Sequence, residues 1–164
     1  FNMGAGYASF QMDLKSAVAI NAAIEKEEIK CADDFHEKLA TKINIVANDL
    51  HATLMYDKRD PDISPGINRK SYKAKVINVE KLGVPGKQFY ALVLTLESEE
   101  IQKRFKELLE LGFEHSFPEL KLHCSLYYGD GTELCYKFMK RLFDEGKLPE
   151  YITLCNENWN ACKD

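Results

Sequence analysis

The chain has 164 residues, of which 45% are hydrophobic and 29% charged, and its formal net charge is −4. This composition is typical of a single globular domain that is large enough to bury a core. The acidic balance gives no general attraction to long nucleic acid or to an anionic membrane, so we expect neither as a partner. No stretch approaches the roughly 18 apolar residues of a membrane span, and no N-terminal apolar segment indicates secretion.

The five cysteines are odd in number, and none belongs to a Cys-x-x-Cys pair. We therefore expect neither a disulfide framework nor a zinc site. Cysteines for which no disulfide is expected are typical of a reducing compartment, so the sequence predicts a cytoplasmic protein.

The first element predicted is a strand over residues 6–12, "GYASFQM", where polar and apolar residues alternate. Tyr7, Ser9 and Gln11 share one face of that strand. Three such residues together are not typical of a core, so we expect this face to line a groove.

Helical sequence follows over residues 13–43, which are rich in Ala, Glu, Lys, Ile and Leu and contain no Gly or Pro. We expect one or two helices, with a break near residues 31–34, where Asp33 or Asp34 can cap the second helix. Residues 48–56 then predict a strand.

A long loop is predicted over residues 57–71, which hold two prolines, a glycine and seven charged residues. Loops of this length are often functional in compact domains. Residues 72–82 predict a strand, and 83–88 a turn. The run "RKSYKAK" at 69–75 holds four cations, and both a solvated strand edge and attraction of a phosphate remain open as its role.

The clearest helix covers residues 98–112, after a mostly apolar strand predicted over 89–97. Ser98 can cap its N-terminus and Gly112 can end it. The apolar residues at helical spacing should form its buried stripe, namely Ile101, Phe105, Leu108 and Leu109.

The last elements predicted are a strand over 120–128, an amphipathic helix over 132–145 and a strand over 150–159. The order strand, helix, strand therefore occurs twice along the chain, although the residues differ. We expect an α+β fold with two pseudo-symmetric β-α-β halves.

A single domain would then comprise residues 1–164. Its first lobe should cover roughly residues 4–56 and its second roughly 72–130. Residues 131–164 would add a C-terminal helix and strand.

Two short motifs end the two halves: "HATLMY" at 51–56 and "HCSLYY" at 123–128. They contain two of the four histidines of the chain. Side chains at i and i+2 of a strand share a face, so His51 lies beside Thr53 and His123 beside Ser125. If the halves pack about a pseudo-two-fold axis, the two pairs face one another across a groove.

Two imidazoles and two hydroxyls suit a phosphodiester. One imidazole can take a proton from the attacking hydroxyl while the other gives one to the leaving oxygen. The hydroxyls can bind the non-bridging phosphate oxygens. No metal-ligand pattern is visible, so neither a metal nor another cofactor is expected.

Two non-catalytic interpretations of the motifs remain open: two edge strands that resemble each other by chance, or a ferredoxin-like sandwich without an active site. His36 and His115 have no comparable partner and are interpreted as structural or exposed. Trp159, the only tryptophan, lies in the polar stretch "NENWNA". It is either an anchor on the core or a ring that stacks on a base.

The pair "HATL" and "HCSL" resembles the twin H-x-[ST]-h signature of the 2H phosphoesterases. That resemblance implies a bilobal α+β fold with a groove between two lobes. It implies a metal-independent phosphodiesterase in which His51 and His123 are catalytic and Thr53 and Ser125 bind phosphate.

The chain also resembles the phage anti-CBASS nucleases, through "GYASF", "LHATLMYDKR", "YALVLTLES" and "LHCSLYYG". Those enzymes hydrolyse cyclic oligonucleotide second messengers and so silence bacterial immune signalling. The resemblance implies that Tyr7 and Trp159 pack against nucleobases, and that the protein acts in the host cytoplasm if its source is viral. The chain departs from that group in Ser125, where Thr is common, in a longer helical segment in its first lobe, and in lacking a tryptophan between the motifs. These departures leave the messenger open.

The expected ligand is thus a small cyclic oligonucleotide, bound by a monomer or weak oligomer. One alternative is an enzyme that opens 2',3'-cyclic phosphates at RNA ends, which the acidic net charge disfavours. Another is a sponge that binds the messenger without cleaving it, which the two intact His and hydroxyl pairs disfavour.

Overall fold

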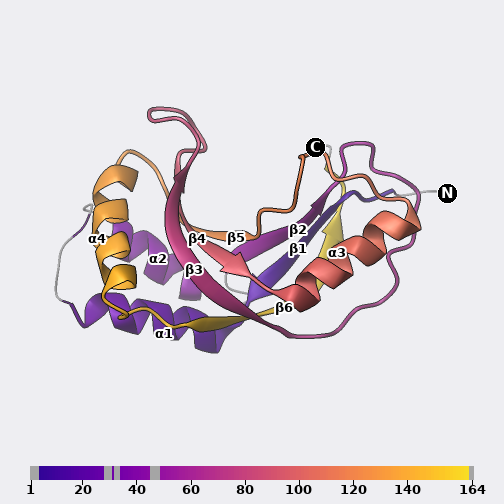
Figure 1. The fold of residues 1–164 in the computed structure, drawn as a ribbon. Coiled ribbons are helices and arrows are strands. Elements are labelled where there is room, and N and C mark those ends of the chain that lie inside the picture. Colours follow the sequence, from indigo (N-terminus) through magenta and orange to yellow (C-terminus); the bar gives the residue numbers. More distant parts are fainter. Residues whose placement is uncertain (1–3, 28–30, 32–33, 45–48, 163–164) are drawn as a thin grey trace.

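The computed structural model describes residues 4–27, 31, 34–44 and 49–162. Within these residues the fold is mixed α+β, with six antiparallel strands and four helices (Figure 1). The sheet closes on itself in the strand order β1-β2-β5-β4-β3-β6. The strands are β1 (Tyr7–Met12), β2 (His51–Tyr56), β3 (Tyr72–Leu82), β4 (Ala91–Glu97), β5 (His123–Tyr128) and β6 (Tyr151–Asn160). The helices are α1 (Leu14–Glu25), α2 (Phe35–Asn44), α3 (Glu99–Leu111) and α4 (Thr132–Asp144).

The predicted alternation of the first strand is confirmed in β1. Ala8, Phe10 and Met12 are fully buried, whereas the odd-numbered residues of the strand remain partly exposed. The odd-numbered face, which carries Tyr7, therefore does not belong to the core.

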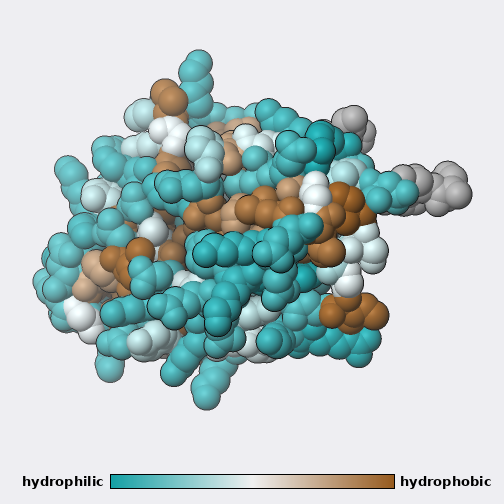
Figure 2. Space-filling model, turned by 45° about the vertical axis from the view of Figure 1, so that its right-hand side comes forward, coloured by the Kyte–Doolittle hydropathy of each residue, from teal (hydrophilic) through white to brown (hydrophobic). Residues whose placement is uncertain are grey.

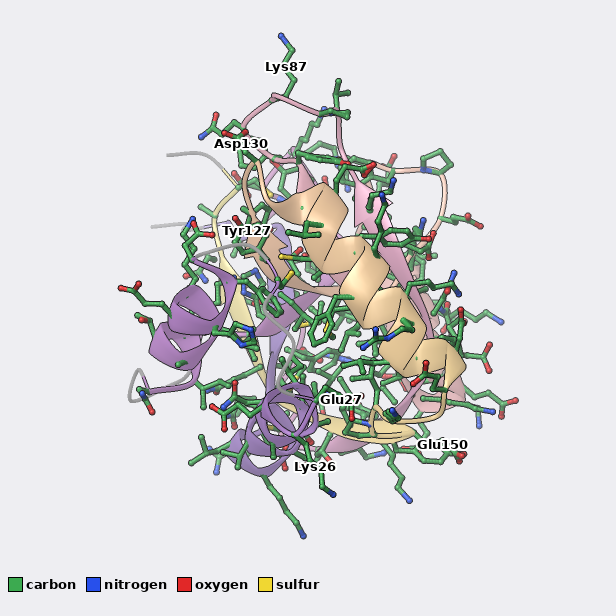
Figure 3. The ribbon with its side chains drawn as sticks, turned by 90° about the vertical axis from the view of Figure 1, so that its left-hand side faces the viewer. Lys26, Glu27, Lys87, Tyr127, Asp130 and Glu150 are labelled. Carbon is green, nitrogen blue, oxygen red and sulfur yellow. The ribbon has the colours of Figure 1, made fainter. Side chains whose placement is uncertain are left out.

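Two helices connect β1 to β2, as expected. Asp13 begins α1 by accepting a hydrogen bond from the backbone N–H of Ser16. Of the two residues proposed to cap the second helix, Asp33 lies outside the described residues. The Asp34 carboxylate accepts a hydrogen bond from Tyr127 Oη at 2.7 Å and pairs with Lys38. Figure 3 shows Tyr127 between α2 and α4, so this bond ties the start of α2 to β5.

Three strands begin two or three residues later than the sequence predicts. β2 starts at His51, β4 at Ala91 and β5 at His123. Consequently each motif histidine is the first residue of its strand, next to the loop that enters it.

Helix α3 has the predicted caps. Ser98 Oγ accepts from the Ile101 N–H at 3.2 Å, and Gly112 ends the helix at a φ of 113°, which favours glycine. The predicted stripe is wrong at Leu109, which is 41% exposed, and Arg104 is buried in its place. Arg104 is buried because its guanidinium pairs with Glu157 of β6.

The core fills the space between the sheet and the helices. Phe10, Phe35 and Phe113, from β1, α2 and the residues after α3, are among its largest fully buried side chains. Helices α1, α2 and α4 gather toward one end of the sheet, and α3 lies at the other (Figure 1). The face in Figure 2 is largely hydrophilic, with apolar side chains in a band across its middle. No helix among the described residues is long and apolar enough to cross a membrane.

Candidate functional site

The two motif strands are neighbours in the sheet. β2 pairs with β5 in antiparallel orientation, with Ala52 opposite Cys124. In such a ladder one step forward on one strand matches one step back on the other, so His51 lies opposite Ser125 and Thr53 opposite His123. Each histidine is therefore beside the hydroxyl residue of the other motif.

The burial of the central pair shows which face the motif residues occupy. Ala52 is 1% exposed and Cys124 is fully buried, so both point into the core. Their neighbours along each strand point to the opposite side of the sheet. His51, Thr53, His123 and Ser125 thus lie together on one face outside the core, where all four are at least partly accessible.

The two motifs also share a backbone irregularity. Where β2 pairs with β1, the register shifts between Ala8 and Ser9 of β1. Where β5 pairs with β4, the register shifts between Leu92 and Val93 of β4. In both strands the motif leucine and the residue after it are buried in succession. The motifs therefore match in conformation as well as in residue type.

The flanking strands extend the face on both sides. On β1, Ser9 lies opposite Thr53 and Gln11 opposite His51. Tyr7 is on the same face of β1, and its hydroxyl lies 3.5 Å from Thr53 Oγ1. The structure thus brings the predicted Tyr7 to the first motif.

The His123 ring is held by the backbone. Its Nδ1 lies 2.7 Å from the carbonyl oxygen of Lys121. Because a carbonyl only accepts hydrogen bonds, Nδ1 carries the hydrogen, and the neutral ring presents Nε2 as an acceptor. This tautomer can take up a proton at Nε2.

A carboxylate lies close to His123. Glu80 of β3 accepts hydrogen bonds from Thr95 Oγ1 and, at 3.2 Å, from Lys121 Nζ. The hydrogen bond from Thr95 is the main cause that lowers the pKa of Glu80, and Lys121 and His123 act in the same direction. Glu80 therefore places a negative charge close to the His123 ring.

A polar groove of about 710 Å³ runs beside His51. Part of its wall comes from the loop between β2 and β3, through Asn68 and Arg69. Its other polar lining residues include Tyr7, Ser9, Gln11, Asn156, Glu157 and Asn158. Of the cationic run at 69–75, Arg69 reaches this groove, whereas Lys73 lies over the ring of Tyr151. Amides, hydroxyls and one guanidinium suit the edges of bases and a phosphate.

A second pocket of about 470 Å³ adjoins Thr53 and His123. His115, which the sequence interpretation left as structural or exposed, lines it together with Tyr56 and Phe117. The Nδ1 of His115 accepts a hydrogen bond from the Tyr56 N–H at 3.0 Å, and burial lowers the pKa of His115. The one signal in the sequence was the density of aromatic residues around His115.

Trp159 is the predicted site residue that the structure does not bring to the others. It lies opposite Ala8 in the β1–β6 ladder, so it points to the core side of the sheet, away from Tyr7. Its ring packs on Phe113 at a centroid distance of 4.8 Å, and its Nε1 donates to Glu157 Oε2 at 2.9 Å. These contacts favour the anchor interpretation over base stacking.

A buried ion pair holds the long loop in place. Arg104 donates through Nε and Nη2 to the two carboxylate oxygens of Glu157, each at 2.8 Å, and through Nη2 to the carbonyl of Pro65. Asn68 Nδ2 also donates to Glu157. Burial alone would raise the pKa of Glu157, but these hydrogen bonds and one from Trp159 outweigh it and lower the pKa. The groove wall formed by Asn68 and Arg69 is therefore fixed by α3 and β6.

Among the residues that the structure describes, no group of three or more His, Cys, Asp or Glu side chains is placed to hold a metal ion. Cys124 lies in the core directly behind the motif face as a free thiol. Burial raises the pKa of the Cys124 thiol to about 12, so it is not a nucleophile near neutral pH.

Two comparisons with known proteins bear on this site. A family model described as "Anti-CBASS protein Acb1" matches residues 16–162. The "Anti-CBASS protein Acb1" of Escherichia phage RB16 is 25% identical over 143 residues, which cover 87% of this chain and 79% of the phage protein. The family match includes both histidine motifs and the strands that carry them.

Proposed function

Because the chain belongs to the Acb1 family of anti-CBASS proteins, we propose that it is a metal-independent phosphodiesterase that hydrolyses cyclic oligonucleotide second messengers and so counters CBASS-type immunity. The observation that carries this proposal is the register of β2 and β5, which sets each motif histidine beside the hydroxyl residue of the other motif. Two matched pairs of an imidazole and a hydroxyl on one face are what acid–base cleavage of a phosphodiester requires.

In the proposed mechanism His123 is the general base. Its Nε2 is free to accept the proton of the attacking hydroxyl, because Nδ1 donates to the Lys121 carbonyl. His51 is the general acid that protonates the leaving oxygen. The backbone contact of His123 supports this order of roles, since it leaves Nε2 of the neutral ring free to accept a proton.

Thr53 and Ser125 take the non-bridging phosphate oxygens in this mechanism. Their positions opposite His123 and His51 place one hydroxyl beside each proton-transfer group. Charge on those oxygens rises as the nucleophile attacks, so the hydrogen bonds strengthen in the transition state. Tyr7, within reach of Thr53, would bind the ligand at the edge of the polar groove.

We further propose the bilobal 2H phosphoesterase arrangement for this single domain. One lobe, roughly residues 4–56, comprises β1 and β2 with helices α1 and α2. The other, roughly residues 72–130, comprises β3, β4 and β5 with α3, and α4 and β6 follow both lobes in the chain. The pseudo-two-fold axis would pass between Ala52 and Cys124. The matched register shifts of β2 and β5 support this symmetry.

The polar groove supports a small ligand rather than a long polynucleotide. Its amides and hydroxyls can bind base edges, and Arg69 can bind a phosphate. The net charge of −4 gives no general attraction to long RNA. A cyclic oligonucleotide, bound by a monomer or weak oligomer, fits both observations.

The proposal is tested by incubating the protein with a panel of cyclic dinucleotides and trinucleotides, and with an RNA that ends in a 2',3'-cyclic phosphate, all in the presence of EDTA. Mass spectrometry should reveal linear products from at least one cyclic oligonucleotide and an unchanged RNA end. Opening of the RNA end alone would favour RNA-end processing. A ligand that disappears from solution but is recovered intact after heat denaturation would identify a sponge.

A further inference from the structure

The pocket beside Thr53 and His123 has a role in neither the proposed proton transfers nor phosphate binding. It is enclosed largely by the segment between α3 and β5, which supplies His115 and the residues from Phe117 to Lys121, and by Tyr56 at the end of β2. Because Thr53 and His123 form part of its wall, anything bound there is next to the proposed phosphate position.

An aromatic side chain stands open at this pocket. Phe117 is 56% exposed, although its ring lies 5.7 Å from that of Tyr56 and 5.6 Å from that of His115. A large apolar ring held by two neighbours and still exposed offers a rigid flat surface.

A hydrogen-bond donor lies beside that ring. His115 uses Nδ1 to accept the Tyr56 N–H, so the neutral ring carries its hydrogen on Nε2. Phe105 packs edge-on against the imidazole at 5.2 Å and 90°, which fixes its orientation. The pocket therefore joins a stacking surface to a fixed N–H donor.

We propose that this pocket binds a nucleobase of the ligand whose phosphodiester lies at Thr53 and His123. Phe117 stacks on the base, and His115 Nε2–H donates to a ring nitrogen or carbonyl of the base. The inference rests on the proposed function, because the shared wall with the histidine face is what identifies the occupant as part of the same ligand. A π-surface beside a few polar groups is typical of base-binding sites.

The test measures ligand affinity in the His51→Ala protein, since His51 does not line this pocket. Isothermal titration calorimetry with cyclic dinucleotides and trinucleotides compares this parent with the same protein carrying Phe117→Ala, His115→Asn or Phe89→Ala. Phe117→Ala should raise Kd about 5- to 150-fold, the effect of one base–aromatic stack. Phe89 is the matched control, because it is a 69% exposed phenylalanine in the turn between β3 and β4, and its removal should leave Kd unchanged.

His115→Asn tests the donor separately. The amide oxygen of Asn can still accept the Tyr56 N–H, while the donor at Nε2 is lost. We expect a rise in Kd of about 2- to 13-fold, corresponding to one hydrogen bond. Melting temperatures of all variants should stay near that of the parent, which confirms that each is folded.

The outcomes separate the pocket from the proposed function. A parent that binds a cyclic oligonucleotide with the same Kd after Phe117→Ala overturns the base pocket and leaves the hydrolase intact. A wild-type protein that binds but does not cleave overturns the hydrolase, and a weakened Kd in Phe117→Ala then still supports the pocket. A parent that binds no member of the panel overturns both.

Discussion

Thr53 and Ser125 give the proposed site its two neutral hydrogen-bond donors, one on each motif strand. If they bind the non-bridging oxygens in the transition state, Thr53→Val should lower kcat by about 10²–10³-fold, as the loss of one such donor does elsewhere. Thr53→Ser keeps the hydroxyl and should retain most of the rate. Steady-state kinetics on the preferred cyclic oligonucleotide measure this, and a Thr53→Val protein with wild-type kcat would contradict the role.

Trp159 provides a second test at the level of one side chain. Since its ring packs on Phe113 and hydrogen-bonds Glu157, Trp159→Ala should lower the free energy of unfolding by about 2–3 kcal/mol, less than the ~3–5 kcal/mol of a fully buried ring. Trp159→Phe should recover most of the loss. Urea denaturation measures both changes, and ligand affinity in Trp159→Phe should equal that of wild type. Weaker ligand binding in either variant without a loss of stability would show that Trp159 belongs to the ligand site.

The sequence could identify residues whose placement depends on local spacing. It could not identify residues whose placement depends on contacts with distant segments of the chain. The motif residues and Tyr7 were predictable because spacing on a strand fixes which side chains share a face. Arg104 was not, because the reason for its burial is Glu157, 53 positions away. His115 was not, because its bond to the Tyr56 backbone joins segments whose proximity the sequence does not encode locally.

At the level of elements, local signals were the most reliable. The ends of α3 were predicted because its caps at Ser98 and Gly112 depend on neighbouring residues only. Strand starts were less predictable: apolar residues such as Leu50 and Leu122 precede β2 and β5 and are buried, yet they lie before the first strand residue. Their carbonyls accept backbone hydrogen bonds from Met12 and Leu96 of the neighbouring strands, so the start of each strand depends on the detailed pairing, which a hydrophobicity pattern does not show.

The loop between β2 and β3 should depend on the buried ion pair. Arg104→Met leaves the Glu157 carboxylate buried without its guanidinium, which should cost about 3–5 kcal/mol of unfolding free energy. Glu107→Ala is the control, because Glu107 is an exposed partner of the same Arg104 and its loss should cost less than about 1 kcal/mol. Urea denaturation compares the two, and equal small losses would contradict the account of the loop.

The start of the same loop should make the protein sensitive to acid. Asp57 is buried and accepts hydrogen bonds from Arg59 and from the Glu114 N–H, and the bond from Arg59 is the main cause that lowers its pKa from 3.8 to about 2. A carboxyl with a lowered pKa stabilises the fold above its unfolded pKa, and that stability is lost as the pH falls toward the folded pKa.

The comparison of wild type with Asp57→Asn isolates this contribution, because the other carboxylates are common to both proteins. The charge-dependent part of the stability difference should be about 2 kcal/mol at pH 7 and about half of that at pH 3. Urea denaturation at the two pH values measures it. A stability difference that does not change with pH would show that the charge of Asp57 does not contribute to the stability of the fold.

For the whole molecule, the sequence predicted the repeated order of elements but not how the halves join. The repeat of strand, helix and strand indicated two similar units, and the structure pairs the strands of each unit, β1 with β2 and β4 with β5. The motif strands of the two units meet at Ala52 opposite Cys124, and the pairing of β3 with β6 closes the sheet on its other side. A slip of one residue between the motif strands would turn one motif into the core, so the join depends on packing throughout the sheet and not on any local pattern.

The central claim is that His51 and His123, from the two halves, act as one acid–base unit. Single-turnover rates on the preferred cyclic oligonucleotide, in EDTA, should be measured for His51→Ala, His123→Ala and the double variant, with His36→Ala of α2 as the control. Each single change should slow cleavage by about 10²–10⁴-fold, and the double variant should be little slower than either, because groups that act as a unit are not additive. Near wild-type cleavage by either single variant, or losses that multiply in the double variant, would contradict the claim.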